Sequence, residues 1–284
     1  MFKYNETLEQ ARERNIDDAL MEDIGKDDWT AKLVDNRLVQ AQLLVRQAAV
    51  LCGIDWFEGA LKKLDPSAII TWRYMEGDMM TSGTKVCDIS ANSRALLSAE
   101  RPCINFLQTL SYTASITREY VNAIAGVSSN PKGCAVLDTR KTIPGLRQAQ
   151  KYAVRVGGGQ NQRLALWHGI LIKENHIAAA GGIAAALKAA NNMNSGVSIQ
   201  IEVENFAELK EALDAGAKNI LIDNFTTEQM KEAVIFNDGR ALLEASGGIH
   251  LEQMLEIAAT GVDRISLGKL TKDIHAVDFS MKIL

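Results

Sequence analysis

The sequence predicts an α/β protein with two domains, and three observations support this prediction. The 284 residues are 47% hydrophobic and 23% charged, an ordinary globular composition with enough apolar material for a large core. Residues 1–100 mix helix and strand patterns without a regular repeat, whereas residues 134–268 alternate short apolar runs with helical stretches. Such an alternation is typical of a parallel sheet, either doubly wound or closed into a barrel.

The first part of the chain is expected to form a mixed α/β domain. A helix is predicted over Glu6–Met21, and strands over Val39–Leu51 and Ile69–Tyr74, with glycines marking the turns between them. Pro102 fits the first turn of a following helix, whose apolar residues recur at helical spacing as far as Ile124. This helix is expected to link the two domains.

Six short apolar runs predict the strands of the second domain. They are Cys134–Asp138, Ile170–Lys173, Ile199–Glu202, Ile220–Asp223, Ala241–Glu244 and Arg264–Gly268. The charged residues that end the first five runs are expected to ring one mouth, because the carboxyl ends of parallel barrel strands converge on one face. These residues are Asp138, Lys173, Glu202, Asp223 and Glu244.

The charge of the chain is unevenly distributed. The formal net charge is −4, which argues against a protein that coats nucleic acid or an anionic membrane through its overall charge. The stretch Thr139–Lys173, however, carries seven Lys and Arg residues and no Asp or Glu. A local positive field of this kind binds anions, although a solvated basic helix face explains part of it equally well. Arg147, Lys151 and Arg155, spaced four apart, are the residues to which that second explanation applies best.

Three glycine-bearing segments are candidates for binding phosphate. Ser246-Gly247-Gly248 and Leu267-Gly268-Lys269 follow the last two predicted strands, where β/α barrels commonly bind phosphate with backbone N–H groups and helix N-termini. Ordinary loop glycines are the alternative. Gly157–Gly159 is a weaker candidate, because it matches neither standard nucleotide-binding loop; a turn that brings Arg163 into the mouth explains it at least as well.

Two of the strand-end carboxylates suit a hard cation. Glu202 and Asp223 offer the oxygen ligands that Mg²⁺ takes from proteins, usually together with substrate phosphates. The same carboxylates could bind ribose hydroxyls or stabilise a developing positive charge. From the residues alone, the chain is therefore predicted to be an enzyme that acts on a polyanionic, phosphorylated substrate with Mg²⁺.

Other classes of protein find little support. Residues Met1–Glu9 contain no apolar run of the kind that signal peptides carry, and no apolar run approaches the length of a membrane span, so a cytoplasmic protein is expected. The four cysteines lie far apart, which favours isolated reduced thiols over zinc or redox motifs.

Taken together, the motifs resemble those of the quinolinate phosphoribosyltransferases, the carboxylating nicotinate-nucleotide pyrophosphorylases. The resemblance runs nearly the length of the chain, including Glu100-Arg101 near its start and Ser266–Thr271 near its end. The motifs that carry it are Asp138-Thr-Arg-Lys-Thr-x-Pro-Gly-Leu-Arg147, Gly157-Gly-Gly-x-Asn-x-Arg163, Leu171-Ile-Lys-Glu-Asn-His176, Glu202-Val-Glu-Asn205, Asp223-Asn-Phe225 and Ser246-Gly-Gly-Ile249.

This resemblance implies the type II phosphoribosyltransferase fold. Residues 1–111 would form an α/β open-faced sandwich, to which the tail 270–284 returns, and residues 112–269 would form an incomplete α/β barrel. The implied reaction transfers a phosphoribosyl group from phosphoribosyl pyrophosphate to quinolinate, giving nicotinate mononucleotide, pyrophosphate and CO₂ for NAD synthesis. The family is at least dimeric, and Arg101 matches the arginine that completes the neighbouring subunit's pocket.

The resemblance also implies roles for individual residues. Lys141, Glu202 and Asp223 match the catalytic residues, with Lys141 at the substrate phosphates and the two carboxylates at the ribose and Mg²⁺. Gln162 stands where the family often has a histidine, so this chain lacks an ionisable group there. The cationic pocket around quinolinate is matched by Arg101, Arg140, Arg163 and Lys173. The remaining substrate-binding positions are matched by Thr139, Ser246, Gly247, Gly248, Leu267, Gly268 and Lys269.

Two alternatives stay open at this point. One is an enzyme of the same fold that acts on a different acceptor, and the other is a binder of phosphoribosyl ligands without activity. The four matching cations favour a dicarboxylate acceptor, and the presence of Lys141, Glu202 and Asp223 favours an enzyme.

Overall fold

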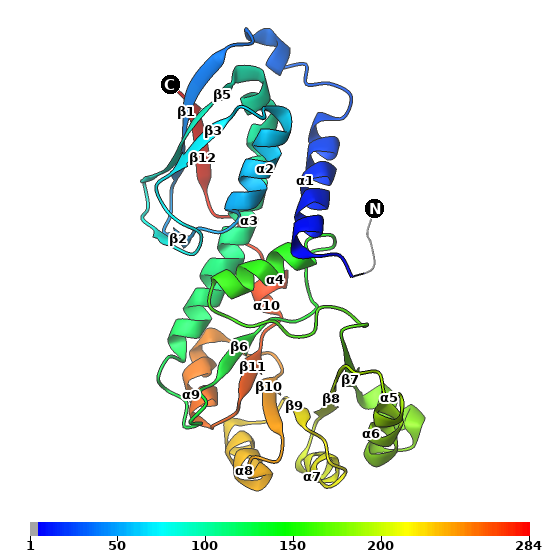
Figure 1. The fold of residues 1–284 in the computed structure, drawn as a ribbon. Coiled ribbons are helices and arrows are strands. Elements are labelled where there is room, and N and C mark those ends of the chain that lie inside the picture. Colours follow the sequence, from blue (N-terminus) through cyan, green and yellow to red (C-terminus); the bar gives the residue numbers. More distant parts are fainter. Residues whose placement is uncertain (1–4) are drawn as a thin grey trace. The chain divides into compact units, whose positions relative to one another are not determined.

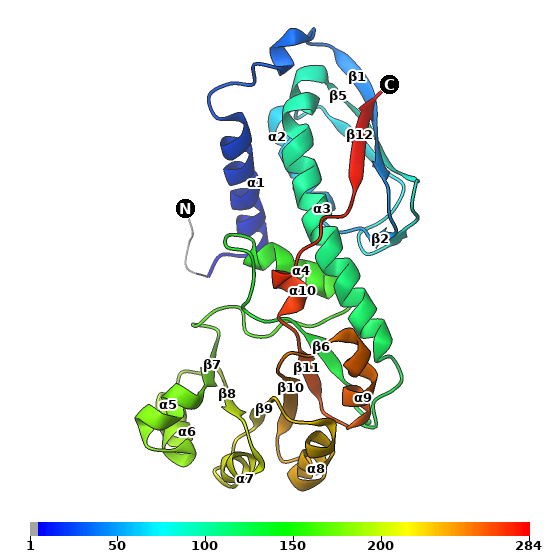
Figure 2. The same cartoon turned by 180° about the vertical axis from the view of Figure 1, so that it is seen from behind.

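The computed structural model describes residues 5–284 and divides into two compact units, whose elements are labelled in Figures 1 and 2. The first unit runs to Arg118 and includes residues 142–158 and 270–284, and the second comprises residues 119–141 and 159–269. Residues 1–4 lie outside the described residues. They include the start of the predicted first domain and part of the segment Met1–Glu9, in which no signal-peptide pattern was found. Within residues 5–284, no helix is both long and apolar enough to cross a membrane.

The first unit is built on a four-stranded antiparallel sheet in the order β12-β1-β5-β3. Burial alternates along β1, so that Val39, Ala41, Leu43 and Val45 form one packed face. The C-terminal strand pairs with β1 from Phe279 to Ile283, which ties the tail to this unit. The strands of the sheet are β1 (Leu38–Val45), β3 (Ile69–Trp72), β5 (Lys85–Asn92) and β12 (Phe279–Ile283), beside a small pair of β2 (Ala49–Val50) and β4 (Met79–Met80).

Helices cover the packed face of this sheet. They are α1 (Leu8–Ile24), α2 (Ile54–Leu64) and α3 (Ser93–Ala123), with the 3₁₀ turn η1 (Ala31–Leu33) between α1 and β1. The prediction that Pro102 begins a helix is wrong, because α3 begins nine residues earlier. The backbone N–H of Arg94 donates to the side-chain oxygen of Asn92 (3.1 Å), a local start signal that the proline obscured. Buried neighbours such as Cys103 and Ile104 anchor the helix past the missing N–H of the proline.

The segment 142–158, which carries α4 (Arg147–Val156), belongs to the first unit although the predicted boundary assigns it to the barrel. Its contacts explain this difference. The carbonyl oxygen of Gly145 accepts hydrogen bonds from Asn15 Nδ2 (3.0 Å) and Arg14 Nη1 (3.3 Å), both on α1. The side chain of Gln150 on α4 donates to the carbonyl of Thr271 in the tail (2.8 Å). The chain therefore leaves the barrel after its first strand and returns for the second.

The second unit is a parallel sheet of six strands in the order β6-β11-β10-β9-β8-β7, and each predicted run supplies one strand. Because β6 and β7 are the two edges, the sheet is open between its first and second strands, which confirms the incomplete barrel. The strands are β6 (Ala135–Leu137), β7 (Gly169–Ile172), β8 (Ser198–Val203), β9 (Asn219–Asp223), β10 (Leu242–Ser246) and β11 (Arg264–Ser266). The helices between and after them are α5 (Glu174–Ala180), α6 (Ile183–Asn192), α7 (Phe206–Asp214), α8 (Thr227–Asn237), the 3₁₀ turn η2 (Leu251–Gln253), α9 (Met254–Ala259) and α10 (Lys269–Lys272).

The two faces of the parallel sheet differ in chemistry. One face is apolar and nearly inaccessible, with Ile201, Ile222, Leu243 and Ile265 at most 1% exposed. The other face presents polar groups, because residues two apart along a strand share a side and Gln200 thus lies with Glu202. The packing of helices against the apolar face leaves the polar face available for the candidate site.

A short segment lies across the open side of the barrel. The backbone N–H of Gln160 donates to the carbonyl of Val136 in β6 (2.8 Å), and the N–H of Asp138 donates to the carbonyl of Gln160 (3.2 Å). Three residues later, Arg163 Nη1 donates to the carbonyl of Gly169 at the start of β7 (2.9 Å). Residues 160–163 therefore contact both edge strands.

Candidate active site

Most of the predicted site residues of the second unit lie at or just after the carboxyl ends of its strands, whereas Arg163 lies in the segment that precedes β7. Lys173 follows β7, Glu202 lies near the end of β8, and Asp223 ends β9. Lys173 Nζ lies 2.9 Å from Glu202 Oε2, and the ammonium side chain is 45% exposed while the carboxylate is 10% exposed. This ion pair joins adjacent strands, and its exposed cation can still contact an anionic ligand.

Asp223 is linked to the glycine-bearing loop of the next strand. It pairs in register with Ser246, and the N–H of Asn224 donates to the carbonyl of Ser246 (3.1 Å). Gly247 has φ +105°, and a Cβ atom there would lie 2.3 Å from Asn224 Oδ1, so only glycine fits. Asn224 Nδ2 also donates to Asp223 Oδ2 (2.9 Å). Close approach of the loop thus explains Gly247, whereas Gly248 is explained by its backbone φ of +55°, since a Cβ atom there would meet nothing within 4 Å.

The second glycine-bearing loop contacts the basic segment that follows β6. A Cβ atom at Gly268 would lie 2.9 Å from Lys141 Cδ and 3.6 Å from Thr139 Oγ1. The N–H of Lys141 donates to Thr139 Oγ1 (3.1 Å), and Lys269 Nζ lies 3.0 Å from His250 Nδ1. Four predicted substrate-binding positions are therefore brought together from both ends of the second unit: Thr139, Lys141, Gly268 and Lys269.

Two arginines of the second unit, Arg140 and Arg163, influence each other electrostatically. Partial burial of Arg163, and next the positive charge of Arg140, lower the pKa of the Arg163 guanidinium from its ordinary value. An arginine remains protonated even so, and the two like charges repel each other. A negatively charged ligand between or beside them would relieve that repulsion.

Two of the five charged residues that were expected to ring the mouth are instead buried. Asp138 is fully buried and accepts hydrogen bonds from Asn161 Nδ2 (2.6 Å) and the N–H of Gln162 (2.8 Å). Glu244 is 1% exposed and lies two residues before the end of β10. The prediction of an open ring of five charges is therefore wrong for this pair, because both carboxylates are taken up by internal hydrogen bonds.

The comparisons with known proteins agree over both units. The chain matches the family models described as the N-terminal domain of quinolinate phosphoribosyl transferase over residues 28–111 and its C-terminal domain over residues 113–282. The chain belongs to the quinolinate phosphoribosyltransferase family. A probable nicotinate-nucleotide pyrophosphorylase (carboxylating) from Bacillus subtilis is 37% identical, with 93% of this chain and 90% of the relative covered. The two family models meet between residues 111 and 113, whereas the compact units divide at residue 118.

Further members of the family are similar over comparable lengths. The mitochondrial quinolinate phosphoribosyltransferase (decarboxylating) 2a of Nicotiana tabacum is 35% identical, with 86% of this chain and 73% of the relative covered. The solved structure of the nicotinate-nucleotide pyrophosphorylase from Francisella tularensis superposes with a TM-score of 0.93 at 39% identity, and each chain is fully covered. The predicted fold class and family are thus confirmed.

Within this family member, several cations of the basic stretch lie in the first unit. Lys151 is 1% exposed on α4, and Arg155 lies over the Tyr152 ring with 5.8 Å from its Cζ to the ring centroid. Arg147 Nε donates to Thr142 Oγ1 (3.1 Å). Arg101 is exposed on α3. The positive charge that the sequence shows as one stretch is thus divided between the two units.

The first residue of the triple glycine Gly157–Gly159 packs closely against α3. A Cβ atom at Gly157 would lie 2.5 Å from the carbonyl oxygen of Ala114 and 2.6 Å from Thr117 Cβ, both on α3. The carbonyl of Gly157 accepts from Arg118 Nε (3.0 Å). These contacts account for Gly157 without a bound phosphate and favour the interpretation as a turn that leads to Arg163.

Among residues 5–284, no three His, Cys, Asp or Glu side chains gather into a metal-binding group. Glu202 and Asp223 therefore fit a cation only as a pair of carboxylates that shares its coordination with other oxygen atoms. Mg²⁺ binds in this manner, with one or two carboxylates and substrate phosphates. The donor set is thus compatible with Mg²⁺ held together with a phosphorylated substrate.

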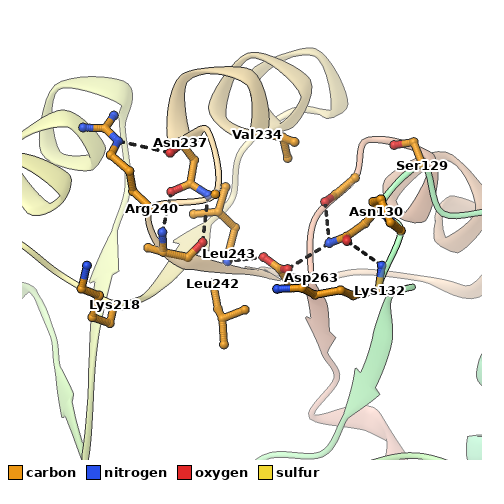
Figure 3. A pocket seen from close by; sticks show the side chains of 14 residues that line it. Ser129, Asn130, Lys132, Lys218, Val234, Asn237, Arg240, Leu242, Leu243 and Asp263 are labelled. Atoms are coloured by element: carbon orange, nitrogen blue, oxygen red, sulfur yellow. Dashed lines mark hydrogen bonds between the residues drawn. The ribbon is translucent and has the colours of Figure 1, made fainter.

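A cavity of about 450 Å³ lies elsewhere in the second unit, before the first residues of β10 and β11 (Figure 3). Several of its polar groups bind one another: Asn130 Nδ2 donates to Asp263 Oδ1 (2.9 Å), and the N–H of Leu243 donates to Asp263 Oδ2 (2.8 Å). None of the predicted site residues lines this cavity, and we do not assign the reaction to it.

Sequence reasoning did not foresee that three buried or half-buried polar residues of the second unit join in one hydrogen-bonded network. Gln162, Gln200 and Glu244 form hydrogen bonds with one another across the polar face of the sheet. Gln200 was detectable in principle, because it lies two residues before Glu202 in an alternating strand. The inward direction of Gln162 had no signal, since it follows from the path of a loop.

Proposed function

We propose that this protein transfers the phosphoribosyl group of phosphoribosyl pyrophosphate to quinolinate and releases pyrophosphate and CO₂, giving nicotinate mononucleotide. The observation that carries the proposal is the arrangement, within one parallel sheet, of the Lys173–Glu202 ion pair, Asp223 and the Lys141–Gly268 contact at neighbouring strand ends. The names of the relatives at 35 and 37% identity support the same reaction.

The acceptor, quinolinate, requires several cations in its binding pocket. Quinolinate carries two carboxylates, and guanidinium groups bind carboxylates with paired hydrogen bonds. Arg140 and Arg163, whose charges already influence each other, supply two such groups, and Lys173 supplies a compact third charge. Arg101 of a second subunit would complete this pocket, which requires at least a homodimer.

The donor would be held through its phosphates. Backbone N–H groups of a tight glycine loop and a helix N-terminus bind phosphate without a side chain, and a lysine adds a point charge. The contact of Lys141 with Gly268 brings these two elements together. The residues we assign to the donor are Thr139, Lys141, Ser246, Gly247, Gly248, Leu267, Gly268 and Lys269.

Charge development explains the two carboxylates. As the quinolinate nitrogen forms a bond to the ribose carbon, pyrophosphate leaves with the electron pair of the bond that breaks, and positive charge grows on the ribose ring. Glu202 and Asp223, near the ends of the adjacent strands β8 and β9, are the carboxylates that we assign to the stabilisation of this charge. Loss of CO₂ then leaves an electron pair on the adjacent ring carbon, stabilised by the positively charged ring nitrogen until it takes up a proton.

Mg²⁺ is the cofactor that we propose for this site. Glu202 and Asp223 would hold it together with oxygen atoms of phosphoribosyl pyrophosphate, and the ion would neutralise charge on the leaving pyrophosphate. Removal of divalent ions with a chelator should abolish product formation, and Mg²⁺ should restore it. Turnover that persists in excess chelator would contradict a role for the ion.

The direct test is an assay of purified protein with quinolinate, phosphoribosyl pyrophosphate and Mg²⁺, in which nicotinate mononucleotide is detected chromatographically. Nicotinate, which lacks the second carboxylate, is the matched control acceptor and should be turned over poorly or not at all. Equal turnover of nicotinate would instead indicate a paralogue with another acceptor. Binding of both substrates without product would indicate a binder without activity.

The shared pocket has its own test. Arg101→Ala and Lys173→Ala should each be inactive alone, and mixing them under conditions of subunit exchange should restore part of the activity. If activity does not recover although subunit exchange has been verified, a pocket formed by two subunits is excluded.

A cytoplasmic location stays a prediction from the sequence.

A further inference from the structure

A buried carboxylate without an assigned role lies beneath the candidate site. Glu244 on β10 is 1% exposed, and a buried carboxylate is costly unless it is well hydrogen-bonded. Gln162 Nε2 donates to both of its oxygens, at 2.9 Å each, and Gln200 Nε2 donates to Oε2 at 3.0 Å. Arg264 Nη1 lies 4.0 Å from Oε2. Glu244 is thus the point at which two side-chain amides from different elements meet.

The Gln162 side chain is fixed at both of its amide atoms. Its Nε2 donates to Gln200 Oε1 (2.9 Å) as well as to Glu244, and its Oε1 accepts the backbone N–H of Arg163 (2.7 Å). Glu244 is therefore connected, through one side chain, to the backbone of the arginine that is assigned to the acceptor.

The residues before Arg163 are fastened in the same way. The backbone of Gln160 bonds to β6, Asn161 Nδ2 donates to the buried Asp138, and the N–H of Gln162 donates to the same carboxylate (2.8 Å). Every residue from 160 to 162 thus has a hydrogen bond to the barrel.

The hydrogen bonds of residues 160–162 matter because Arg163, the next residue, carries a charge that another arginine repels. Partial burial of Arg163, and next the positive charge of Arg140, lower the pKa of the Arg163 guanidinium, and the two like charges repel each other. A freely moving loop would carry Arg163 away from Arg140 and lose the anion site until a ligand arrived. A loop that is held in place keeps the site formed in advance, and preorganisation of this kind strengthens binding.

We propose that Glu244 is a positioning residue that holds Arg163 at the acceptor site through the side chain of Gln162. It does not touch the substrate. The inference rests on the proposed function, because quinolinate is the anion whose binding it serves. It predicts that a buried residue on β10 controls affinity for one substrate and not for the other.

The test compares the kinetics of Glu244→Gln with those of the unchanged protein. The variant keeps the size of the side chain but replaces one accepting oxygen by a donor that opposes the amide N–H groups of Gln162 and Gln200. The KM for quinolinate should rise about 10- to 100-fold, while kcat and the KM for phosphoribosyl pyrophosphate change by no more than about threefold. Gln162→Ala should give the same changes in KM and kcat. Because position 162 is a half-buried loop position that should tolerate truncation, this variant tests the proposal even if Glu244→Gln fails to fold.

A matched control and a double-mutant cycle separate positioning from general damage. Leu243→Ala changes the neighbouring residue, equally buried on the opposite face of β10, and should lower thermal stability without raising the KM for quinolinate. In an Arg163→Ala background, Glu244→Gln should have no further effect on quinolinate affinity measured by calorimetry, because its effect acts through that arginine.

The outcomes distinguish the inference from the proposed function. If the unchanged protein makes no nicotinate mononucleotide, the proposed function fails. If it does, the inference alone is overturned by an unchanged KM for quinolinate in folded Glu244→Gln or Gln162→Ala protein, by additive effects in the cycle, or by an equal rise in Leu243→Ala.

Discussion

The sheets of the two units differ in what they bury. The first sheet buries an apolar face, whereas the second buries apolar residues on one face and polar residues on the other. Leu43 on β1 packs in a core with Trp56 and Phe57 of α2. In the second unit Gln200 and Glu244 are buried on the face opposite to Ile201 and Leu243. A sheet stabilised from one side can carry charged groups on its other side, provided that each buried group is hydrogen-bonded.

The comparison predicts a large loss of stability from a cavity in the first unit. Phe57 is fully buried, and Phe57→Ala should lower the free energy of unfolding by about 3–5 kcal/mol, measured by urea denaturation. The control is Phe206→Ala on α7 of the second unit, where the ring is 37% exposed and the loss should stay near about 1 kcal/mol. Equal losses of unfolding free energy in the two variants would show that burial of the ring does not determine its contribution to stability at these positions.

Removal of a site carboxylate should have the opposite signature, with loss of activity but little loss of stability. Glu202→Gln should lower kcat by about 100- to 1,000-fold, because a neutral amide no longer stabilises the positive charge of the transition state. Glu58→Gln on α2 of the first unit is the matched control, since Glu58 also pairs with a lysine, Lys62, and its other oxygen accepts a hydrogen bond from Trp72 Nε1 (2.8 Å). Similar kcat values for the two variants would remove Glu202 from the catalytic set.

The triple glycine provides a smaller effect that distinguishes packing from ligand binding. Gly157→Ala should destabilise the first unit by about 1–3 kcal/mol, because the new methyl group meets the carbonyl of Ala114 at 2.5 Å. Thermal denaturation measures the loss, and kinetics at low temperature should show an unchanged KM for phosphoribosyl pyrophosphate. A stable Gly157→Ala protein with weakened donor binding would revive the phosphate-cradle interpretation.

The smallest predicted effect concerns the thiols. Burial, and next the charge of Asp263, raise the pKa of Cys134 in the second unit to about 12, whereas an unfolded thiol titrates near about 8.5. Above that pH the unfolded chain loses a proton that the folded chain keeps, so stability falls as pH rises. Between pH 8 and 9.5 this one thiol should cost about 1 kcal/mol.

Denaturant titrations at the two pH values would measure this loss, and Cys134→Ser should reduce it by that amount. Cys52, Cys87 and Cys103 of the first unit, whose pKa values burial also raises, would account for a larger remaining share. An identical pH dependence in Cys134→Ser would contradict the assignment.

The elements that could be predicted are those with a strong local pattern. The six apolar runs of the second unit each contain a strand, because a short run of apolar residues that ends at a polar residue or a glycine is a local signal of a buried strand. The start of α3 could not be predicted in this way. The proline at position 102 offered a stronger local signal than Asn92, and only packing against the core of the first unit allows the helix to continue through it.

The candidate site shows the same division between local and distant causes. The glycines at 247 and 268 and the residues Lys173, Glu202 and Asp223 were identifiable, because turn chemistry and strand ends are properties of neighbouring residues. The burial of Asp138 and Glu244 was not, since it depends on a loop from residues 160–163 that folds back across the barrel.

The sequence by itself determined the parallel sheet, the family and most of the residues at the strand ends, because each is written in short patterns of hydrophobicity, glycine and charge. Only the tertiary structure decided which charges face a ligand and which support the backbone. The basic stretch from Thr139 to Lys173 is continuous in sequence, yet α4 and its cations lie in the first unit while Arg140, Lys141, Arg163 and Lys173 lie in the second. Net charge along a chain adds up locally, but an electrostatic field depends on where folding places each charge.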